Sequence, residues 1–182
     1  MGKLTPPAPI NMVHIPDNFD CGVSSLDQWL RRQALKNEAS GASRTFVVCF
    51  GKEVVGYYAL ATGSVLRQQA PGKIKRKMPE PIPVMVLGRL AVDRKWQGSG
   101  LGSSLLRDAL LRTYNVSSQA GIRALLVHAL SENAKAFYHR HGFLQSPIDP
   151  MTLMLNLQDV QHCLEKRDSE NTKIPGSRPD LG

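Results

Sequence analysis

Arg94-Lys95-Trp96-Gln97-Gly98-Ser99-Gly100-Leu101-Gly102 is a glycine-rich turn, and the segments on either side of it organise this 182-residue chain. The turn follows an almost wholly apolar run, Val84 to Val92, which predicts a central strand covered on both faces. After the turn, apolar residues keep helical spacing at Leu101, Leu105, Leu106, Ala109 and Leu110. Glycines let several backbone N–H groups approach a bulky anion, and a helix N-terminus favours negative charge. The turn therefore predicts an anion site between a buried strand and a helix.

The glycine spacing narrows the choice of anion. A Walker loop ends in Gly-Lys-Ser/Thr, and this turn has no such ending. A dinucleotide fingerprint reads G-x-G-x-x-G, but here the glycines are Gly98, Gly100 and Gly102, so the third comes one position early. The turn also stands after three or four predicted strands rather than after the first. The alternative is a turn whose glycines serve only tight packing.

The remaining segments predict a β-α-β-β-β-α-β-α-β order. We expect strands at 10–15, 45–50, 54–62, 84–92, 122–130 and 152–157, and helices at 24–40, 101–110 and 132–141. Ser24 and Ser131 are expected to cap their helices, and residues 65–83 are expected to form a long polar connection. This order predicts one α/β (α+β) domain with a mixed sheet over residues 1–157. Residues 158–182 form a polar tail that is expected to be poorly ordered.

Charge and cysteine usage suggest an anionic partner and a reducing compartment. The formal net charge is +8, and the last 25 residues carry −1, so the preceding part carries +9. This excess favours a polyanion such as nucleic acid, an anionic cofactor, or simply a well-solvated surface. The three cysteines have no metal-ligand spacing, which favours a cytoplasmic protein with free thiols. No apolar run approaches the ~20 residues that cross a bilayer, so we expect no membrane segment.

A second motif lies at Ser131-Glu132-Asn133-Ala134-Lys135-Ala136-Phe137-Tyr138-His139-Arg140-His141-Gly142-Phe143. Tyr138 lies at its centre. Ala134, Phe137 and Tyr138 share one helical face, so Tyr138 can be a core aromatic of an amphipathic helix. His139 and His141 have no third ligand at metal spacing, so we expect no metal site.

Together these motifs resemble the GNAT family of N-acetyltransferases. The turn fits its Gln/Arg-x-x-Gly-x-Gly/Ala pattern as Gln97-x-x-Gly100-x-Gly102, and the second motif fits N-x-x-A-x-x-F/L-Y-x-x-x-G-F. The resemblance implies a central, mixed, mostly antiparallel twisted sheet flanked by helices, with acetyl-CoA as donor. It implies that Tyr138 protonates the leaving thiolate. The expected cofactor contacts are Leu90, Ala91, Val92, Gln97, Gly98, Ser99, Gly100, Leu101, Gly102, Ser103, Asn133 and Phe137.

Within that family, the chain resembles the GNAT toxins of bacterial toxin–antitoxin pairs, the TacT/AtaT/KacT type. The resemblance runs from about Phe19 to Leu157, and its most specific part is Leu87-Gly88-Arg89-Leu90-Ala91-Val92-Asp93 together with Gln-Gly-x-Gly-Leu-Gly. It implies acetylation of the free α-amine on aminoacyl-tRNA, which blocks translation. It also implies a ribbon-helix-helix antitoxin and a homodimer. The alternatives are a GNAT enzyme acting on a protein or small-molecule amine, and a GNAT-like binding module without catalysis.

Two basic clusters and one basic residue of the central strand are candidate tRNA contacts. They are Lys73, Lys75, Arg76 and Lys77 before that strand, Arg31, Arg32, Lys36 and Arg44 nearer the N-terminus, and Arg89 within it. For any one of these residues, a solvated charge is the alternative.

The general base is not identified by any motif. Residues 84–92 contain no carboxylate, and Glu53 and Glu80 are possible but lie outside the motifs. An α-amine has a pKa of ~8 against ~10.4 for lysine, so much more of it is neutral near pH 7. The missing carboxylate therefore favours an α-amine as acceptor.

Overall fold

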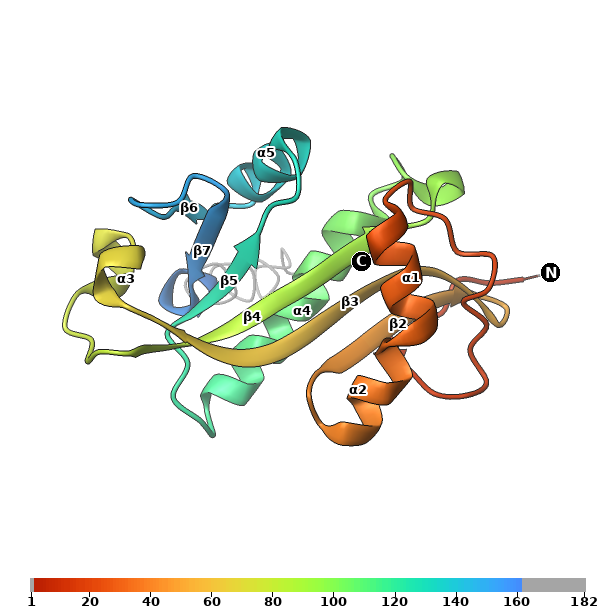
Figure 1. The fold of residues 1–182 in the computed structure, drawn as a ribbon, viewed down its shortest axis with the longest axis horizontal. Coiled ribbons are helices and arrows are strands. Elements are labelled where there is room, and N and C mark those ends of the chain that lie inside the picture. Colours follow the sequence, from red (N-terminus) through yellow and green to blue (C-terminus); the bar gives the residue numbers. More distant parts are fainter. Residues whose placement is uncertain (1, 162–182) are drawn as a thin grey trace, which may run out of the picture.

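The computed structural model describes residues 2–161, which form one seven-stranded sheet flanked by helices (Figure 1). The sheet order is β1-β2-β3-β4-β5-β7-β6, and β4–β5 is the one parallel neighbour pair among the described strands. The strands are β1 (Ala8–Pro9), β2 (Arg44–Phe50), β3 (Glu53–Val65), β4 (Ile82–Val92), β5 (Ala124–His128), β6 (Leu144–Gln145) and β7 (Thr152–Asn156). The predicted mixed, mostly antiparallel sheet is confirmed.

Helices cover both faces of the sheet, as Figure 1 shows. One face packs against α4 (Leu101–Ser117) and α5 (Glu132–Arg140), which contribute the buried Leu105, Leu106 and Tyr138 to the largest core cluster. The other face packs against α1 (Ser24–Arg32), α2 (Ala34–Ser40) and the short α3 (Gly72–Lys75). The face with α4 and α5 is called the α4 face below, and the other the α1 face.

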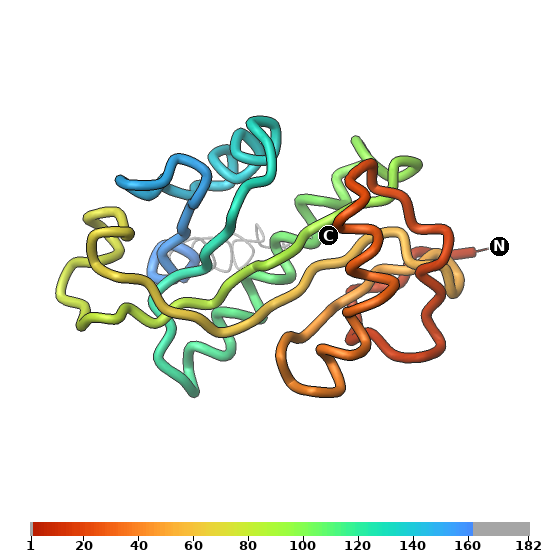
Figure 2. The backbone as a smooth tube through the Cα atoms, in the orientation of Figure 1, coloured from red at the N-terminus to blue at the C-terminus, as the bar shows by residue number. Residues whose placement is uncertain are grey.

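The strands β4 and β5 run side by side for only part of their length. Their pairing extends from Val84–Ala124 to Leu87–Val127, whereas β4 stays paired with β3 up to Val92. Beyond Leu87 the two backbones separate, which is visible in the tube drawing (Figure 2). The β5-facing edge of residues 88–92 therefore has no strand partner among the described residues, and its polar backbone groups face the gap.

A β-bulge lies at the same point. The register between β3 and β4 shifts so that Ala59 faces Arg89 while Leu60 faces Leu87. Below the bulge Met85 and Leu87 belong to the α4 face, but above it Leu90 packs on that face and Ala91 on the α1 face. Gly88 is the extra residue of the bulge. It reverses the alternation of side chains between the two faces of the sheet, so that Arg89 points toward α1.

Several predicted elements have different bounds in the structure. The first strand is at Ala8–Pro9, not at 10–15, because Asn11 and His14 fold residues 11–14 into a turn through side-chain hydrogen bonds. The helix predicted at 24–40 is broken at Gln33, and Val23 rather than Ser24 occupies its cap position. The connection at 65–83 contains a 3-10 turn (Arg67–Gln69) and α3.

The folded part continues beyond residue 157. Residues 157–161 are helical, Val160 is buried in the largest core cluster, and Asp159 pairs with Lys73 at 2.7 Å. The expectation of poor order for the rest of the tail falls on residues 162–182, which lie outside the described residues.

Candidate functional site

A cleft of about 210 Å³ opens where β4 and β5 separate. Its walls come from the segment leading into α1, from the upper part of β4, from the glycine-rich turn, and from β5 through the start of α5. Of the residues predicted from the sequence, it is lined by Arg89, Leu90, Ala91, Val92, Gln97 and Tyr138. The tertiary structure therefore brings one residue of the turn and the tyrosine to the same cavity.

The turn begins with a 3-10 segment (Arg94–Trp96) that Asp93 holds in place. The buried carboxylate of Asp93 accepts hydrogen bonds from the backbone N–H of Lys95 (3.0 Å) and of Asp20 (3.1 Å). Gln97 fastens the next part, because its amide Nε2 donates to the carbonyls of Val92 and Cys21, both at 2.9 Å. The Gln97 amide nitrogen is thus a structural brace between the turn, β4 and the entrance to α1.

The glycines then set the shape of the turn. Gly98 (φ 77°) and Gly100 (φ 86°) are left-handed, and a Cβ at either would meet open space within 4 Å. Gly102 lies in the first turn of α4, near Val92 and Phe137. Ser99 donates its hydroxyl to the Trp96 carbonyl, which holds the turn closed on itself. The exposed backbone from Gly98 to Gly100 leads directly into a 17-residue helix, as an anion site requires.

Replacement of Gly100 by alanine tests this geometry. A left-handed conformation costs a non-glycine residue roughly 1–2 kcal/mol, so the turn is expected to relax away from it. We expect acetyl-CoA affinity to fall about tenfold, measured by titration calorimetry. The matched control is Gly72→Ala, since Gly72 also has open space around it but no left-handed φ. Equal affinity in Gly100→Ala and the wild type would remove the backbone of this turn from the anion site.

Tyr138 lies in the opposite wall, on the α4 face. Its ring is 8% exposed and packs edge-on against Phe137 and Phe143 at centroid distances of 5.3 Å. No hydrogen-bond partner for its hydroxyl occurs among the described residues. Burial raises the pKa of the Tyr138 hydroxyl above its usual value, so this group stays protonated at neutral pH. Tyr138 is therefore a neutral proton donor facing a cleft.

Eight of the predicted cofactor residues do not line the cleft: Gly98, Ser99, Gly100, Leu101, Gly102, Ser103, Asn133 and Phe137. Asn133 is exposed on α5, and Phe137 is half-buried between Tyr138 and the ring of His141. Ser103 is exposed on α4 and lies 3.2 Å from Nε2 of His141, whose Nδ1 lies 2.8 Å from the Phe137 carbonyl. His141 thus links α4 to α5.

Arg89 occupies the other side of the cleft, on the α1 face. Its guanidinium stacks over the Trp29 ring at 4.2 Å from the centroid. Partial burial lowers the pKa of Arg89, but an arginine remains charged at neutral pH. The β-bulge and the Trp29 ring together hold the Arg89 guanidinium at the cleft.

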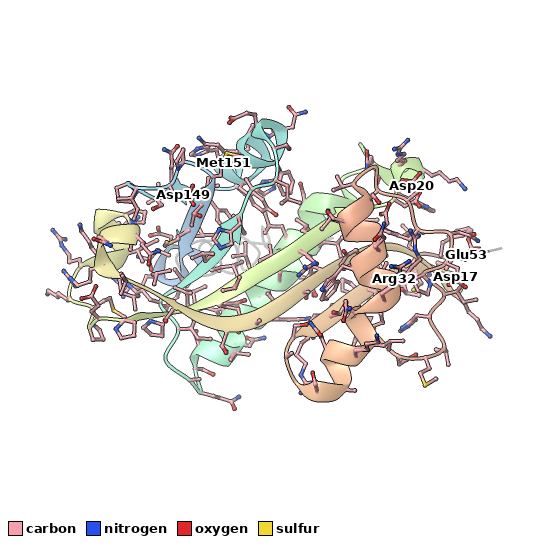
Figure 3. All side chains as sticks on the ribbon, viewed as in Figure 1. Asp17, Asp20, Arg32, Glu53, Asp149 and Met151 are labelled. Carbon is pink, nitrogen blue, oxygen red and sulfur yellow. The ribbon has the colours of Figure 1, made fainter. Side chains whose placement is uncertain are left out.

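Neither carboxylate considered as a base reaches this site. Glu80 accepts a hydrogen bond from the Arg67 backbone and Glu53 from the Asn18 side chain. Figure 3 shows Glu53 beside Asp17, on the opposite side of the molecule from Asp149. Sequence reasoning also missed His128, which lines the cleft at the end of β5. The sequence feature that could have identified His128 is its position directly after the apolar run 124–127. Polar side chains at the ends of buried strands are commonly functional.

The basic cluster before β4 is held rigidly. Arg67 donates to the carbonyls of Lys75 (2.8 Å) and Met78 (2.6 Å), and Arg123 donates to those of Ile74 and Lys73. Lys73 is paired with Asp159, which partly neutralises it. Arg76, Lys77 and Arg123 line one further pocket together.

The second basic cluster is partly engaged within the protein. Arg31 donates to the Phe19 carbonyl at 2.8 Å, and Arg44 pairs with Glu38 at 3.1 Å. Arg32 and Lys36 are exposed. Two of the four predicted contacts therefore already have internal partners.

Two general properties follow from residues 2–161. No group of three or more His, Cys, Asp or Glu side chains in this range is placed to hold a metal ion. No helix in this range has the length and apolarity that a membrane span needs.

The chain is similar to known acetyltransferases. Residues 41–145 match the acetyltransferase (GNAT) domain family. The tRNA-acetylating toxin of Mycobacterium tuberculosis is 53% identical over 144 residues, which cover 79% of this chain and 87% of that protein.

Two solved structures are also similar. AtaT complexed with acetyl-methionyl-tRNAfMet has a TM-score of 0.83 and 28% identity, covering 89% of this chain and 99% of that chain. A tyrosine-to-phenylalanine mutant of AtaT, bound to the C-terminus of the antitoxin AtaR and acetyl-CoA, has a TM-score of 0.77 and 26% identity, covering 90% and 99%.

Proposed function

Because this chain belongs to the GNAT acetyltransferase family, we propose that it is a toxin that transfers the acetyl group of acetyl-CoA to the α-amine of aminoacyl-tRNA. The observation that carries the proposal is that a neutral tyrosine and Gln97, the first residue of the glycine-rich segment leading into α4, line one cleft. Acetylation of that amine blocks translation, because an amide nitrogen no longer attacks a peptidyl ester.

The turn and the free edge of β4 are the proposed donor site. The backbone from Gly98 to Gly102, with Leu101 and Ser103 at the start of α4, holds the pyrophosphate through N–H groups and the helix N-terminus. The edge of β4 at Leu90, Ala91 and Val92 that faces away from β3 pairs with the amides of pantetheine, as an added strand pairs with a sheet edge. The Val92 carbonyl is not available for this pairing, because it already accepts from Gln97. Phe137 supports Tyr138 from behind, while Asn133 reaches the donor from the cleft mouth.

Tyr138 is the proposed general acid. As the amine nitrogen bonds to the thioester carbon and the C–S bond breaks, the Tyr138 hydroxyl gives its proton to the sulfur. The leaving thiolate has a reference pKa of ~8.5, and a phenol in a dry wall is a donor of suitable strength. Burial on the α4 face keeps the phenol neutral until that moment.

The acceptor enters from the α1 face, where the surface is basic. The α3 basic patch (Lys75, Arg76, Lys77 and Arg123) is the proposed main contact with tRNA phosphates, because its backbone is braced by Arg67 and Arg123. Arg89 adds charge at the cleft, and Arg32 and Lys36 are exposed on α1 and α2. Lys73, Arg31 and Arg44 contribute less because they have internal partners.

The proposed partners follow from the family resemblance. We propose a cytoplasmic homodimer that a ribbon-helix-helix antitoxin restrains; AtaT, for comparison, is bound to the C-terminus of its antitoxin. Sedimentation of the purified chain, alone and with such a protein, measures both assemblies.

The deciding experiment is transfer of labelled acetyl from acetyl-CoA to total aminoacyl-tRNA. Uncharged tRNA and a peptide mixture are parallel acceptors. We expect label on charged tRNA alone, released together with the amino acid when the ester is hydrolysed. Label on peptides alone would instead assign a protein acceptor, and no label anywhere would leave a binding module.

A further inference from the structure

The cleft has few groups that can accept a proton. Its titratable lining residues are Cys21, Arg89, His128 and Tyr138. Burial and the hydrogen bond with Asp27 raise the pKa of the Cys21 thiol to about 11, so it remains protonated at neutral pH. Arg89 is a permanent cation and Tyr138 a neutral acid. Among the described lining residues, His128 alone has a side-chain nitrogen that can accept a proton, when its imidazole is neutral.

His128 and Tyr138 approach the cleft from opposite faces of the sheet. Along β5, Leu125 and Val127 pack on the α4 face with Tyr138, whereas Ala124 and Leu126 pack on the other face. Since side chains alternate along a strand, His128 follows Leu126 onto the α1 face. The proton donor and the imidazole therefore flank the cleft, one on the donor side and one on the acceptor side.

A chain of hydrogen bonds sets the tautomer of His128. Nδ1 lies 2.8 Å from Thr152 Oγ1, and the Thr152 hydroxyl donates to Asp149 Oδ2 at 2.6 Å. Because the threonine proton is directed to the carboxylate, Thr152 Oγ1 accepts from His128 Nδ1–H. The lone pair is then on Nε2, which is not tied to any described residue.

The carboxylate at the end of this chain is held in its charged form. Hydrogen bonds from the Thr152 hydroxyl and the Met151 backbone lower the pKa of Asp149 below its usual value. Asp149 and Met151 lie together beside β6 and β7 (Figure 3). Asp149 therefore stays ionised at neutral pH and keeps the Thr152 proton pointing away from His128.

We propose that His128 is the general base of the reaction, with Thr152 and Asp149 as positioning residues; this rests on the proposed acetyl transfer. The neutral amine attacks the thioester carbon, and as the N–C bond forms one amine proton moves to His128 Nε2. The C–S bond breaks and the sulfur takes the Tyr138 proton. Solvent then removes the proton from the imidazolium and restores that of the phenol, so amine and thioester become amide and thiol. The charged groups around His128 are Arg89 across the cleft and Asp149 beyond Thr152.

The test variant is His128→Asn in the full chain. The asparagine amide keeps an N–H donor near the position of Nδ1 for Thr152 but has no basic nitrogen. We expect kcat/KM for aminoacyl-tRNA to fall about 10²-fold with unchanged acetyl-CoA affinity. As the pH is lowered, log kcat/KM of the wild type should fall with a slope that approaches two, because both the base and the amine must be deprotonated. The variant should retain a slope of about one, from the amine alone.

Two further variants separate catalysis from structure. Thr152→Val removes the hydroxyl between His128 and Asp149, and we expect a smaller loss of kcat/KM than in His128→Asn. The acidic limb of its pH profile should shift along the pH axis but keep the wild-type slope. His14→Asn, in the N-terminal segment away from the cleft, should match the wild type. A His128→Asn enzyme with the wild-type rate and slope, or one that no longer binds acetyl-CoA, would overturn the proposal. The acceptor assay is first carried out on the wild type, which tests the proposed acceptor without any variant. The rate of His128→Asn is then measured on whichever acceptor the wild type labels. Failure of the proposed acceptor and failure of His128 as the base are thus distinguished.

Discussion

Tyr138→Phe is expected to lose ~10²–10⁴ in kcat while keeping its affinity for acetyl-CoA. The substitution removes only the hydroxyl, and the ring contacts with Phe137 and Phe143 remain. Without a proton donor, CoA must leave as a thiolate anion. The buried surroundings of Tyr138 disfavour such a charge. Single-turnover acetyl transfer to charged tRNA measures the rate, and calorimetry measures acetyl-CoA binding.

The matched control is Tyr114→Phe, on α4 and away from the cleft lining, which should behave as the wild type. In cells, growth arrest on expression should disappear in Tyr138→Phe and persist in Tyr114→Phe. If Tyr138→Phe lost acetyl-CoA binding along with activity, Tyr138 would be a core residue of the donor site rather than the acid.

Combined reversal of Lys75, Arg76 and Lys77 to Glu is expected to lower kcat/KM for aminoacyl-tRNA by ~10²–10³ at low salt. Each lost phosphate contact contributes roughly tenfold there, and its loss reduces the slope of log affinity against log salt by about one. Acetyl-CoA affinity should not change, because the α3 basic patch and the glycine-rich turn are separate sites. Binding of tRNA from 50 to 200 mM salt gives the slope.

Lys52→Glu is the control for the charge itself. Lys52 lies in the turn between β2 and β3, at the end of the hairpin distant from α3, and its reversal should leave the slope unchanged. Reversal of Arg32 and Lys36 tests the second cluster in the same assay. A slope that does not change on reversal of Lys75, Arg76 and Lys77 would remove α3 from the tRNA surface.

Much of the fold was predictable because its signals are local. The glycine-rich turn was predicted between a buried strand and a helix, and it lies between β4 and α4, with positive φ at Gly98 and Gly100. Ser131 was predicted to cap a helix, and its hydroxyl accepts from the Ala134 N–H. The first strand was placed wrongly because its apolar residues say nothing about the turn that Asn11 and His14 form.

The site was less predictable because its faces depend on packing. Apart from Gly88 and Arg89, the run from Val84 to Val92 is apolar, so it has no alternation from which a bulge or the direction of Arg89 can be predicted. The same limitation hid His128, whose role depends on Thr152 and Asp149, more than twenty residues away along the chain. The charges of Lys73, Arg31 and Arg44 were visible, but their internal partners were not.

The sequence by itself determined the main strand and helix segments, the position of the glycine-rich turn and Tyr138 as the candidate acid, but it missed α3 and β6. The features that it determined depend on side-chain type and spacing over a few residues. Only the tertiary structure decided that β5 leaves β4 after Leu87 and that a bulge reverses the upper part of β4. It also decided that Tyr138 and His128 meet the cleft from opposite faces. The reason is physical, because strand register and the choice of face are settled by the burial of whole layers against each other, not by any one segment.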